Sequence, residues 1–292
     1  MNSPKTILVT GGAGFIGSHL CERLVLGGHN VISLDNYFTG SRENHVDGVE
    51  YREGHTKDIE RLVLETPDII YHLGEYSRVA KSIEEPEVVF DLNIKGTFGV
   101  LEFWRKRGGK LVYAGSSTKF ADTREDGVAG RDLSPYTWSK AANSELVVNY
   151  ARWYNLPYAI VYFYNVYGPR ERSGIDAYGT IVETFRKLSS EGRPLTVRSP
   201  GTQTRNFTHV HDTVSGILLV GERGEGDEYG ISAQETYSLL NLAAMFGGEI
   251  EMSPPTVTTR SGGGEVDASK IEALGWKQEK TLEKYIRQLK EI

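Results

Sequence analysis

Residues 6–17 read TILVTGGAGFIG, and this stretch decides the fold. Thr6–Thr10 is a short apolar run rich in β-branched residues, which predicts a buried strand. The glycine-rich turn Gly11–Gly17 follows, and apolar residues at helical spacing then predict a helix over Ser18–Leu26. A glycine-rich turn between a strand and a helix is the context in which such a turn binds a dinucleotide.

The chemistry of that turn favours a phosphate ligand. Missing side chains let the backbone approach a pyrophosphate, and the free N–H groups at a helix start attract the anion. A second expected strand, Asn30–Leu34, ends at Asp35, 18 residues beyond Gly17. A carboxylate there can accept hydrogen bonds from the adenine ribose and would repel a 2′-phosphate, so the sequence predicts NAD rather than NADP. The alternative is a purely structural turn with Asp35 in a loop.

The next 130 residues continue the alternation of apolar runs and helical patterns. We expect strands over 68–73, 110–114 and 158–163, and long helices over 87–106 and 136–154. This order predicts an α/β fold with a parallel sheet covered on both faces. The alternation loosens after Tyr164, so we expect a cofactor domain over 1–164 and a smaller α/β lobe mainly over 165–292, with the chain free to cross back.

The composition is that of a soluble globular protein, with 292 residues, 39% hydrophobic and 25% charged. The net charge is −6 and basic runs are missing, so no nucleic-acid partner is expected. Cys21 is the only cysteine, which excludes a disulfide within the chain and fits a reducing compartment. Without a signal-peptide pattern or an apolar run of about 18 residues, a cytoplasmic protein with no membrane span is expected.

Tyr136 and Lys140 stand at i and i+4 of a predicted helix and therefore share one face. An ammonium near a phenol favours the phenolate, which can take a hydroxyl proton while a hydride leaves for NAD. A surface Tyr and Lys would show the same spacing. Ser116 favours the catalytic interpretation, because it follows the expected strand 110–114, at the sheet edge where α/β folds bind ligands.

Motifs along the whole chain resemble one family, the extended short-chain dehydrogenases/reductases. The resemblance is to their NAD-dependent nucleotide-sugar epimerase/dehydratase branch, which is UDP-glucose 4-epimerase-like. It is carried by Gly11–Gly17, Asp35-Asn36, His72-Leu73, Asn93, Ser116, Tyr136/Lys140, Tyr167–Arg170, Gly201–Asp212 and Asp267–Trp276. It implies a Rossmann-type doubly wound parallel sheet with a smaller α/β C-terminal substrate lobe. It also implies a UDP- or GDP-linked sugar as substrate, and a homodimer formed through the long helices.

The resemblance also implies a role for individual residues. Ser116, Tyr136 and Lys140 would be the catalytic trio. The NAD-binding residues would be Gly11, Gly14, Phe15, Ile16, Asp35, Asn36, Gly40, Leu73, Gly74, Ala114, Tyr136, Lys140 and Phe163. The substrate-binding residues would be Glu75, Arg78, Ser116, Ser117, Asn165, Arg205 and Arg260, with the two last arginines gripping the diphosphate.

The residues after Ser116 bear on the reaction. In this branch the 4,6-dehydratases carry an Asp-Glu pair there, and the decarboxylases keep the Glu. Here the two positions are Ser117 and Thr118, which favours a 4-epimerase. In that reaction the sugar is oxidised at C4, the ketone turns over, and hydride returns to its other face. A 4,6-dehydratase or a net C4 oxidoreductase is the alternative. An NAD-binding sensor without catalysis is a third hypothesis, which the intact Ser116, Tyr136 and Lys140 oppose.

Two places depart from the family pattern or invite another interpretation. Glu75 and Arg78 stand where the branch more often has small apolar residues and then a Lys; we expect Glu75 to have a structural or sugar-binding role, with acid/base chemistry or pairing to Arg78 as alternatives. His209, His211 and Asp212 do not have the spacing of a strong zinc site, so no metal is expected. Asp212 is expected to cap a helix or to pack the lobes together.

Overall fold

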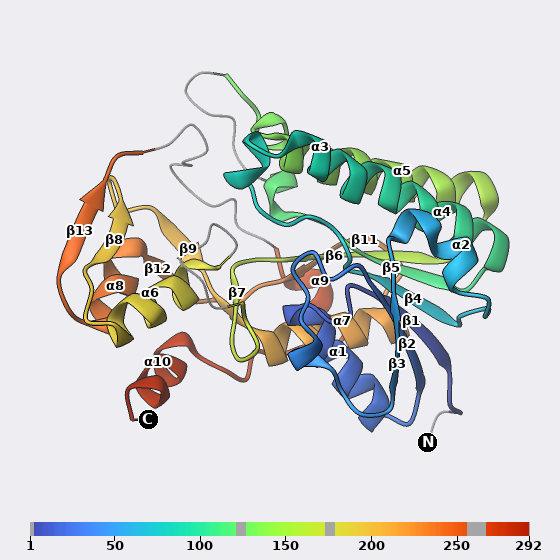
Figure 1. The fold of residues 1–292 in the computed structure, drawn as a ribbon, viewed down its shortest axis with the longest axis horizontal. Coiled ribbons are helices and arrows are strands. Elements are labelled where there is room, and N and C mark those ends of the chain that lie inside the picture. Colours follow the sequence, from blue (N-terminus) through green and yellow to red (C-terminus); the bar gives the residue numbers. More distant parts are fainter. Residues whose placement is uncertain (1–2, 121–126, 173–178, 256–266, 292) are drawn as a thin grey trace.

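The computed structural model describes residues 3–120, 127–172, 179–255 and 267–291. Among them, seven parallel strands form one central sheet in the order β11-β6-β5-β4-β1-β2-β3 (Figure 1). The strands are β1 (Thr6–Thr10), β2 (Asn30–Asp35), β3 (Val49–Glu53), β4 (Ile69–His72), β5 (Lys110–Ala114), β6 (Tyr158–Phe163) and β11 (Gly226–Ile231). The parallel sheet that the alternation predicts is confirmed, and it is the Rossmann-type doubly wound sheet that the resemblance implies.

Helices cover both faces of this sheet because successive side chains of a strand point to opposite sides. On one face Ile7 and Val9 pack against α1 (Phe15–Leu26) and α7 (Val210–Arg223). On the other face Leu8 packs against α4 (Gly96–Arg107) and α5 (Pro135–Tyr154). Ile7, Leu8 and Val9 are all fully buried, as expected of a central strand of a parallel sheet.

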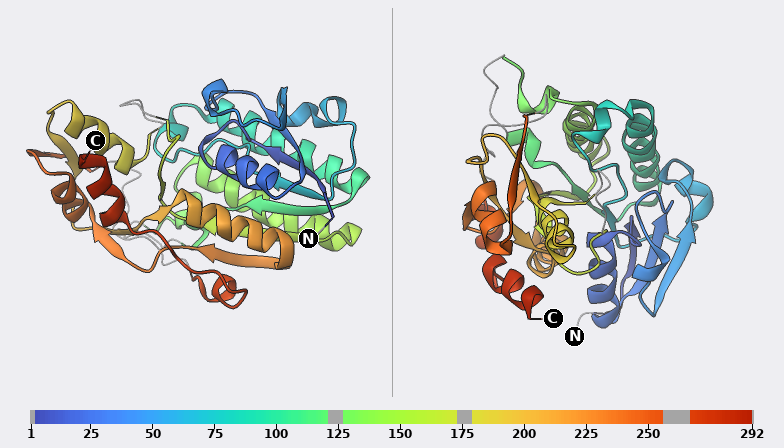
Figure 2. Two further views of the ribbon diagram at one scale, coloured as in Figure 1. Left: turned by 90° about the horizontal axis from the view of Figure 1, so that it is seen from below. Right: turned by 60° about the vertical axis from the view of Figure 1, so that its left-hand side comes forward.

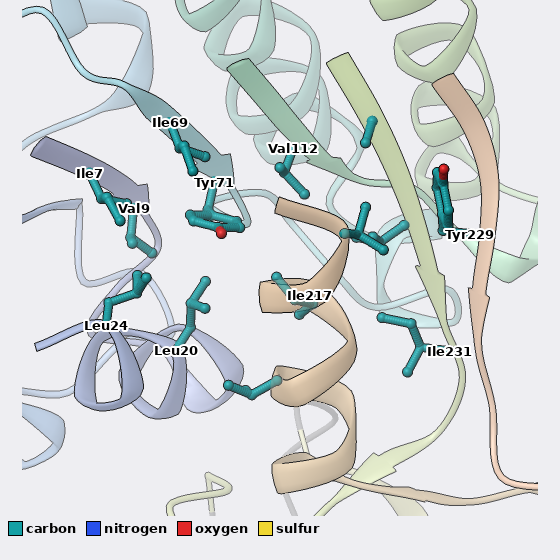
Figure 3. Packing of buried hydrophobic residues seen from close by; sticks show 14 of the residues in the cluster. Ile7, Val9, Leu20, Leu24, Ile69, Tyr71, Val112, Ile217, Tyr229 and Ile231 are labelled. Carbon is teal, nitrogen blue, oxygen red and sulfur yellow. The ribbon is translucent and has the colours of Figure 1, made fainter. Parts of the chain in front are cut away.

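Figure 3 shows the packing between the sheet and the helices α1 and α7. Leu20 of α1 and Ile217 of α7 lie against the strands, in the same cluster as Tyr71 of β4. Helix α7 approaches the sheet closely at Gly221, where an added Cβ would lie 1.9 Å from the Tyr71 hydroxyl oxygen. A larger residue at Gly221 would therefore push α7 off the sheet.

The helix expected over 87–106 is present but interrupted. The structure has α3 (Pro86–Val89), a π-helical segment η4 (Phe90–Lys95) and then α4. Asn93 lies inside the π-helical segment, where its side chain accepts from the Tyr76 amide (2.6 Å) and donates to the Ser139 hydroxyl (2.9 Å). Such insertions occur frequently at functional sites, and this one connects the loop after β4 to α5.

A second, smaller unit lies beyond one end of the sheet (Figures 1 and 2). Three short strand pairs contribute to it: β7 (Val166–Tyr167) with β10 (Thr208–His209), β8 (Leu195–Arg198) with β13 (Ile250–Ser253), and β9 (Thr204–Asn206) with β12 (Thr236–Ser238). Its helices are α6 (Ile181–Ser190), α8 (Leu239–Phe246) and α10 (Leu282–Lys290), which share an apolar core of their own. The chain returns from this unit to the sheet through α7, β11 and α9 (Ser269–Glu272).

Short helices complete the described part of the chain. They are α2 (Ile59–Leu62), η1 (Arg42–Asn44), η2 (Thr56–Asp58), η3 (Lys81–Ile83), η5 (Ser117–Phe120) and η6 (Gly130–Asp132). Within the described residues, every helix is too short or too polar to cross a membrane.

Candidate functional site

A cleft of about 1080 Å³ opens at the carboxyl ends of the sheet strands. The strand order reverses between β1 and β4, and doubly wound sheets bind ligands at such a reversal. Apart from Arg260, every cofactor, substrate and catalytic residue named from the sequence borders this cleft. Arg260 lies outside the described residues. The cleft extends from the glycine-rich turn to Arg205 and Leu239 of the smaller unit, so both units contribute to it.

The glycine-rich turn has a backbone geometry that only glycine permits at two positions. Gly11 has a φ of +75°, and an added Cβ there would lie 2.9 Å from the Gly74 Cα. At Gly17 an added Cβ would lie 2.0 Å from the Gly11 carbonyl oxygen. The turn ends at Gly14, the N-cap of α1, and the first N–H groups of a helix have no acceptor within it. These residues fit a pyrophosphate at the helix start.

Asp35 lies at the end of β2 and connects two segments of the cofactor end of the cleft. Its carboxylate accepts from the Ala13 amide (2.9 Å) and from the Tyr37 amide (2.8 Å). Burial raises the pKa of the Asp35 carboxyl, and the two amide donors partly offset this effect. Gly40 faces the carboxylate, since an added Cβ would lie 3.0 Å from Asp35 Oδ1. The acidic end of β2 therefore fits the ribose hydroxyls of a dinucleotide.

Ser116 and Tyr136 converge on the same part of the cleft, with 3.4 Å between the Tyr136 hydroxyl and the Ser116 Oγ. Tyr136 is placed by the first turn of α5, where Ser134 and Thr137 form a capping box: the Thr137 amide donates to Ser134 Oγ (3.2 Å) and the Ser134 amide to Thr137 Oγ1 (2.9 Å). Ser116 follows β5, and its Oγ lies 2.9 Å from the Thr118 Oγ1. The two hydroxyl groups can therefore bind a single substrate oxygen.

Lys140 lies one turn after Tyr136 on α5, and its side chain is 5% exposed. The ammonium donates to the Ala114 carbonyl oxygen at the end of β5 and forms an ion pair with Glu75. Glu75 follows β4, and its side chain is only 4% exposed. The sequence predicts a structural or sugar-binding role for Glu75, and the structure pairs its buried carboxylate with Lys140 at the border of the cleft.

Other residues that the sequence assigned to substrate binding approach the cleft from the smaller unit and from the loops. Asn165 follows β6 with a left-handed φ of +39°, and its side-chain Nδ2 donates to the Asn206 carbonyl oxygen (2.9 Å). Arg205 lies in β9 and donates to the Thr204 carbonyl oxygen (2.7 Å). Ser117 is almost fully buried in η5, directly behind Ser116.

Glu171 also borders the cleft, and the sequence did not indicate it. Its carboxylate accepts from the Thr180 amide (2.8 Å). Burial raises the pKa of Glu171 to about 7. Its only sequence signal was its position directly after Tyr167–Arg170, which by itself does not indicate burial.

The histidine pair lies at the start of α7, where His209 has a structural role. His209, not Asp212, caps α7, because its Nδ1 accepts from the His211 amide (3.1 Å). Asp212 instead accepts from the Lys280 amide (2.9 Å), so it fastens the C-terminal segment to α7. Of the two roles expected for Asp212, the cap is therefore wrong, and the packing of the two lobes stays a prediction.

Comparison with known proteins agrees with this geometry. The model of the NAD-dependent epimerase/dehydratase family matches residues 7–232. A Methanocaldococcus jannaschii protein described as a "putative UDP-glucose 4-epimerase" is 31% identical, over 97% of this chain and 96% of that protein. A UDP-N-acetyl-alpha-D-glucosaminuronate decarboxylase of Bacillus cytotoxicus is 30% identical, over 82% of this chain and 78% of that protein.

A solved structure is similar over nearly the whole length. The UDP-glucose 4-epimerase of Thermotoga maritima, solved with UDP-glucose, superposes with a TM-score of 0.90 at 27% identity. The match covers 98% of this chain and 97% of the Thermotoga chain. The two-unit arrangement around the cleft is thus shared with this relative.

Proposed function

Because the chain belongs to the NAD-dependent epimerase/dehydratase family, we propose that it is a nucleotide-sugar 4-epimerase. The observation that carries this proposal is the turn after β5. Ser116 faces Tyr136 in the cleft, and the two buried residues that follow, Ser117 and Thr118, are hydroxyl residues rather than acids. Such a site can remove and return a proton at one sugar hydroxyl, but these positions have no acid to eliminate water from the neighbouring carbons.

In the proposed reaction, Ser116 holds the oxygen at C4 of the sugar and Tyr136 takes its proton as a phenolate. Bound NAD supplies the hydride acceptor and donor for this chemistry. Lys140 supports the phenolate electrostatically from the same helix face. The 4-keto sugar then turns over within the cleft, so that the other face of C4 receives the hydride while Tyr136 returns the proton to the C4 oxygen.

We assign cofactor binding to the part of the cleft built by β1, β2 and the glycine-rich turn. The start of α1 would hold the pyrophosphate and Asp35 the adenine ribose. We assign the nucleotide diphosphate of the substrate to the opposite end, where Arg205 enters from β9 and Asn165 from the loop after β6. Arg205 suits this role because a guanidinium can grip phosphate oxygens bidentately.

The proposal is tested by incubating the purified protein with UDP- and GDP-linked hexoses and following the products by NMR and mass spectrometry. An epimerase gives a product of unchanged mass with inverted configuration at C4, without net formation of NADH. Loss of water would indicate a dehydratase, and loss of carbon dioxide from a uronic acid would indicate a decarboxylase. Steady accumulation of NADH would indicate a net oxidoreductase. Any of these three results would contradict the epimerase.

We also propose that two copies associate through α4 and α5. Large aromatic side chains are exposed on these helices and on η4 beside them, among them Phe98, Trp138 and Trp153. The ring of Trp138 packs edge-on against Phe90 of η4, at 5.8 Å between centroids, so α5 and η4 present these two rings together. Sedimentation should show a dimer that Phe98→Glu dissociates; a wild-type monomer at micromolar concentration would contradict it.

We further propose that the protein acts in a reducing compartment such as the cytoplasm. The buried free thiol of Cys21 supports this proposal.

A further inference from the structure

The Glu75 carboxylate is buried at the border of the cleft, in contact with Lys140 of the proposed catalytic trio. We infer that Glu75 is a positioning residue: it fixes the Lys140 ammonium and reduces the positive field that Lys140 exerts on Tyr136. This inference rests on the proposed use of Tyr136 as the proton acceptor. It assigns Glu75 a role that neither a substrate ligand nor an acid/base catalyst would have.

The first support is that hydrogen-bond donors surround the Glu75 carboxylate. Besides the Lys140 ammonium, three donors point at Glu75 Oε1: Thr97 Oγ1 (2.9 Å), Asn143 Nδ2 (2.9 Å) and the Tyr113 hydroxyl (3.1 Å). Burial disfavours the charged carboxylate, but the Lys140 charge and these donors outweigh it, so the pKa of Glu75 lies below its usual value. Glu75 is therefore an ionised group with fixed geometry.

The second support is a buried hydrogen-bond chain that orients Thr97 toward Glu75. The two ring nitrogens of His72 each contact a hydroxyl group: Nδ1 lies 2.7 Å from Thr10 Oγ1, and Nε2 lies 2.9 Å from Thr97 Oγ1. Burial lowers the pKa of His72 to about 4, so the ring is neutral. Thr97 donates its only hydroxyl proton to Glu75, so it accepts from His72 Nε2–H. Nδ1 of the neutral ring then accepts from the Thr10 hydroxyl, which itself accepts from the Gly74 amide (3.0 Å).

The third support is that Lys140 is held from two sides. Its ammonium donates to the Ala114 carbonyl oxygen and to Glu75, and it lies 4.5 Å from the centroid of the Tyr113 ring. Two anchors on different strand ends leave one N–H of the ammonium for the cleft. A smaller residue at position 75 would remove one anchor and leave Lys140 free to move toward the cleft.

The charges around Tyr136 determine the sign of the effect. From the protein interior, Lys140 on α5, Glu75 after β4, Tyr113 on β5 and the neutral His72 on β4 surround the site. On the cleft side, the charged side chains within the described part of the chain that border the same cavity are Asp35, Glu43, Arg78, Arg170, Glu171, Arg172 and Arg205. The Lys140–Glu75 pair is nearly neutral as a unit. Removing the carboxylate charge leaves the ammonium uncompensated, which favours the phenolate of Tyr136 and lets it form at lower pH.

The experiment is a pH titration of the NAD-loaded protein in which phenolate is followed by ultraviolet absorbance. Each protein is measured against its own Tyr136→Phe derivative, so the difference reports Tyr136 among the other tyrosines. Glu75→Gln should lower the midpoint by about one pH unit, the effect of one charge several ångströms away at an effective dielectric constant of about 20. Glu75→Asp keeps the charge and should leave the midpoint near that of the wild type.

Two further variants make the test decisive. Thr97→Val removes one hydrogen bond to the carboxylate without changing any charge, so it should not move the midpoint. Glu75→Ala introduces the small apolar residue that the branch more often carries here, and it replaces Glu75→Gln if the latter does not fold; the expected shift is the same. An unchanged or raised midpoint in the charge-removing variant would overturn the inference.

The titration uses no sugar, so its outcome is separable from the proposed function. Failure to epimerise any nucleotide sugar, with the midpoint shift intact, would refute the 4-epimerase and leave the role of Glu75 standing. Epimerisation of a nucleotide sugar with no midpoint shift would refute the role of Glu75 and leave the 4-epimerase standing.

Discussion

Replacing Asp35 by Asn tests the construction of the cofactor end of the cleft most directly. The Asp35 carboxylate accepts one amide hydrogen bond on each oxygen, from Ala13 and from Tyr37. The two side chains have the same shape, but an asparagine amide has one oxygen and one NH2 group. One backbone N–H would therefore keep its acceptor, and the other would face a donor.

The magnitude follows from these two contacts. A hydrogen bond to a charged group contributes about 1.5–3 kcal/mol, and a buried N–H left without an acceptor costs about 1–3 kcal/mol. Removing a buried carboxylate charge offsets part of this loss. We expect Asp35→Asn to lower the free energy of unfolding of the NAD-free protein by about 2–3 kcal/mol. We also expect NAD binding to weaken about tenfold or more and the preference for NAD over NADP to shrink.

Denaturant unfolding followed by tryptophan fluorescence, together with calorimetric titration of NAD and NADP, measures all three quantities. Asp68→Asn is the matched control, because Asp68 also accepts a backbone N–H, that of Thr6 (2.8 Å), but is exposed and does not border the cleft. The control should unfold within about 0.5 kcal/mol of the wild type and bind NAD unchanged. If Asp35→Asn is as stable as this control and keeps its NAD affinity, the assigned role of the carboxylate is wrong.

Three further outcomes are expected. Tyr136→Phe should lower kcat by about 10²–10⁴-fold in the epimerase assay, while calorimetry shows unchanged NAD binding, because only the proton acceptor is lost; full activity would exclude the phenolate mechanism. The pKa of Glu171 is raised to about 7 by burial, so the folded state keeps a proton that the unfolded chain loses above about pH 4.5. Stability contributed by this group therefore falls as the pH rises from about 4.5 to 7. The free energy of unfolding of Glu171→Gln, measured in urea, should rise relative to that of the wild type by up to about 3 kcal/mol between pH 4 and pH 8. A constant difference between the two proteins over this pH range would contradict the expectation. Trp104 is fully buried and donates to the Gly109 carbonyl oxygen (3.0 Å), so Trp104→Ala should lower the free energy of unfolding by about 3–5 kcal/mol, against less than about 0.5 kcal/mol for the exposed Leu64→Ala.

Much of the fold could be predicted because its central strands are buried on both faces and read as apolar runs. The bounds of β1, β5 and β6 agree with the sequence prediction, and α1 begins at Phe15 rather than at Ser18. Strand β3 was missed, because it lies at the sheet edge and three of the five residues in its sequence VEYRE are charged, so it does not form an apolar run. The π-helical interruption was also missed, since it depends on contacts of Asn93 with Tyr76 and Ser139, which are remote in sequence.

The candidate site could be predicted wherever its signal is local. Gly11–Gly17 is one continuous stretch that forms the turn and the start of α1, and Tyr136 and Lys140 are one helical turn apart, so the local sequence is enough to group the members of each set. The surroundings of Glu75 have no local signal. Its partners Thr97, Tyr113 and Asn143 lie on α4, β5 and α5, and only the folded sheet brings them to one carboxylate.

Each member of the proposed trio is oriented by a different device, and this explains why the site is suited to a reversible proton transfer. The capping box at Ser134 fixes the start of α5 and hence Tyr136, while Thr118 lies within hydrogen-bond distance of the Ser116 hydroxyl. Glu75 and the Ala114 carbonyl hold Lys140. Thr118, at the second position after Ser116 and only 3% exposed, is thus used to orient Ser116. A threonine hydroxyl is too weak an acid to assist the elimination of water from a sugar. In the proposed reaction, the residue at this position therefore supports Ser116 and offers no acid for elimination.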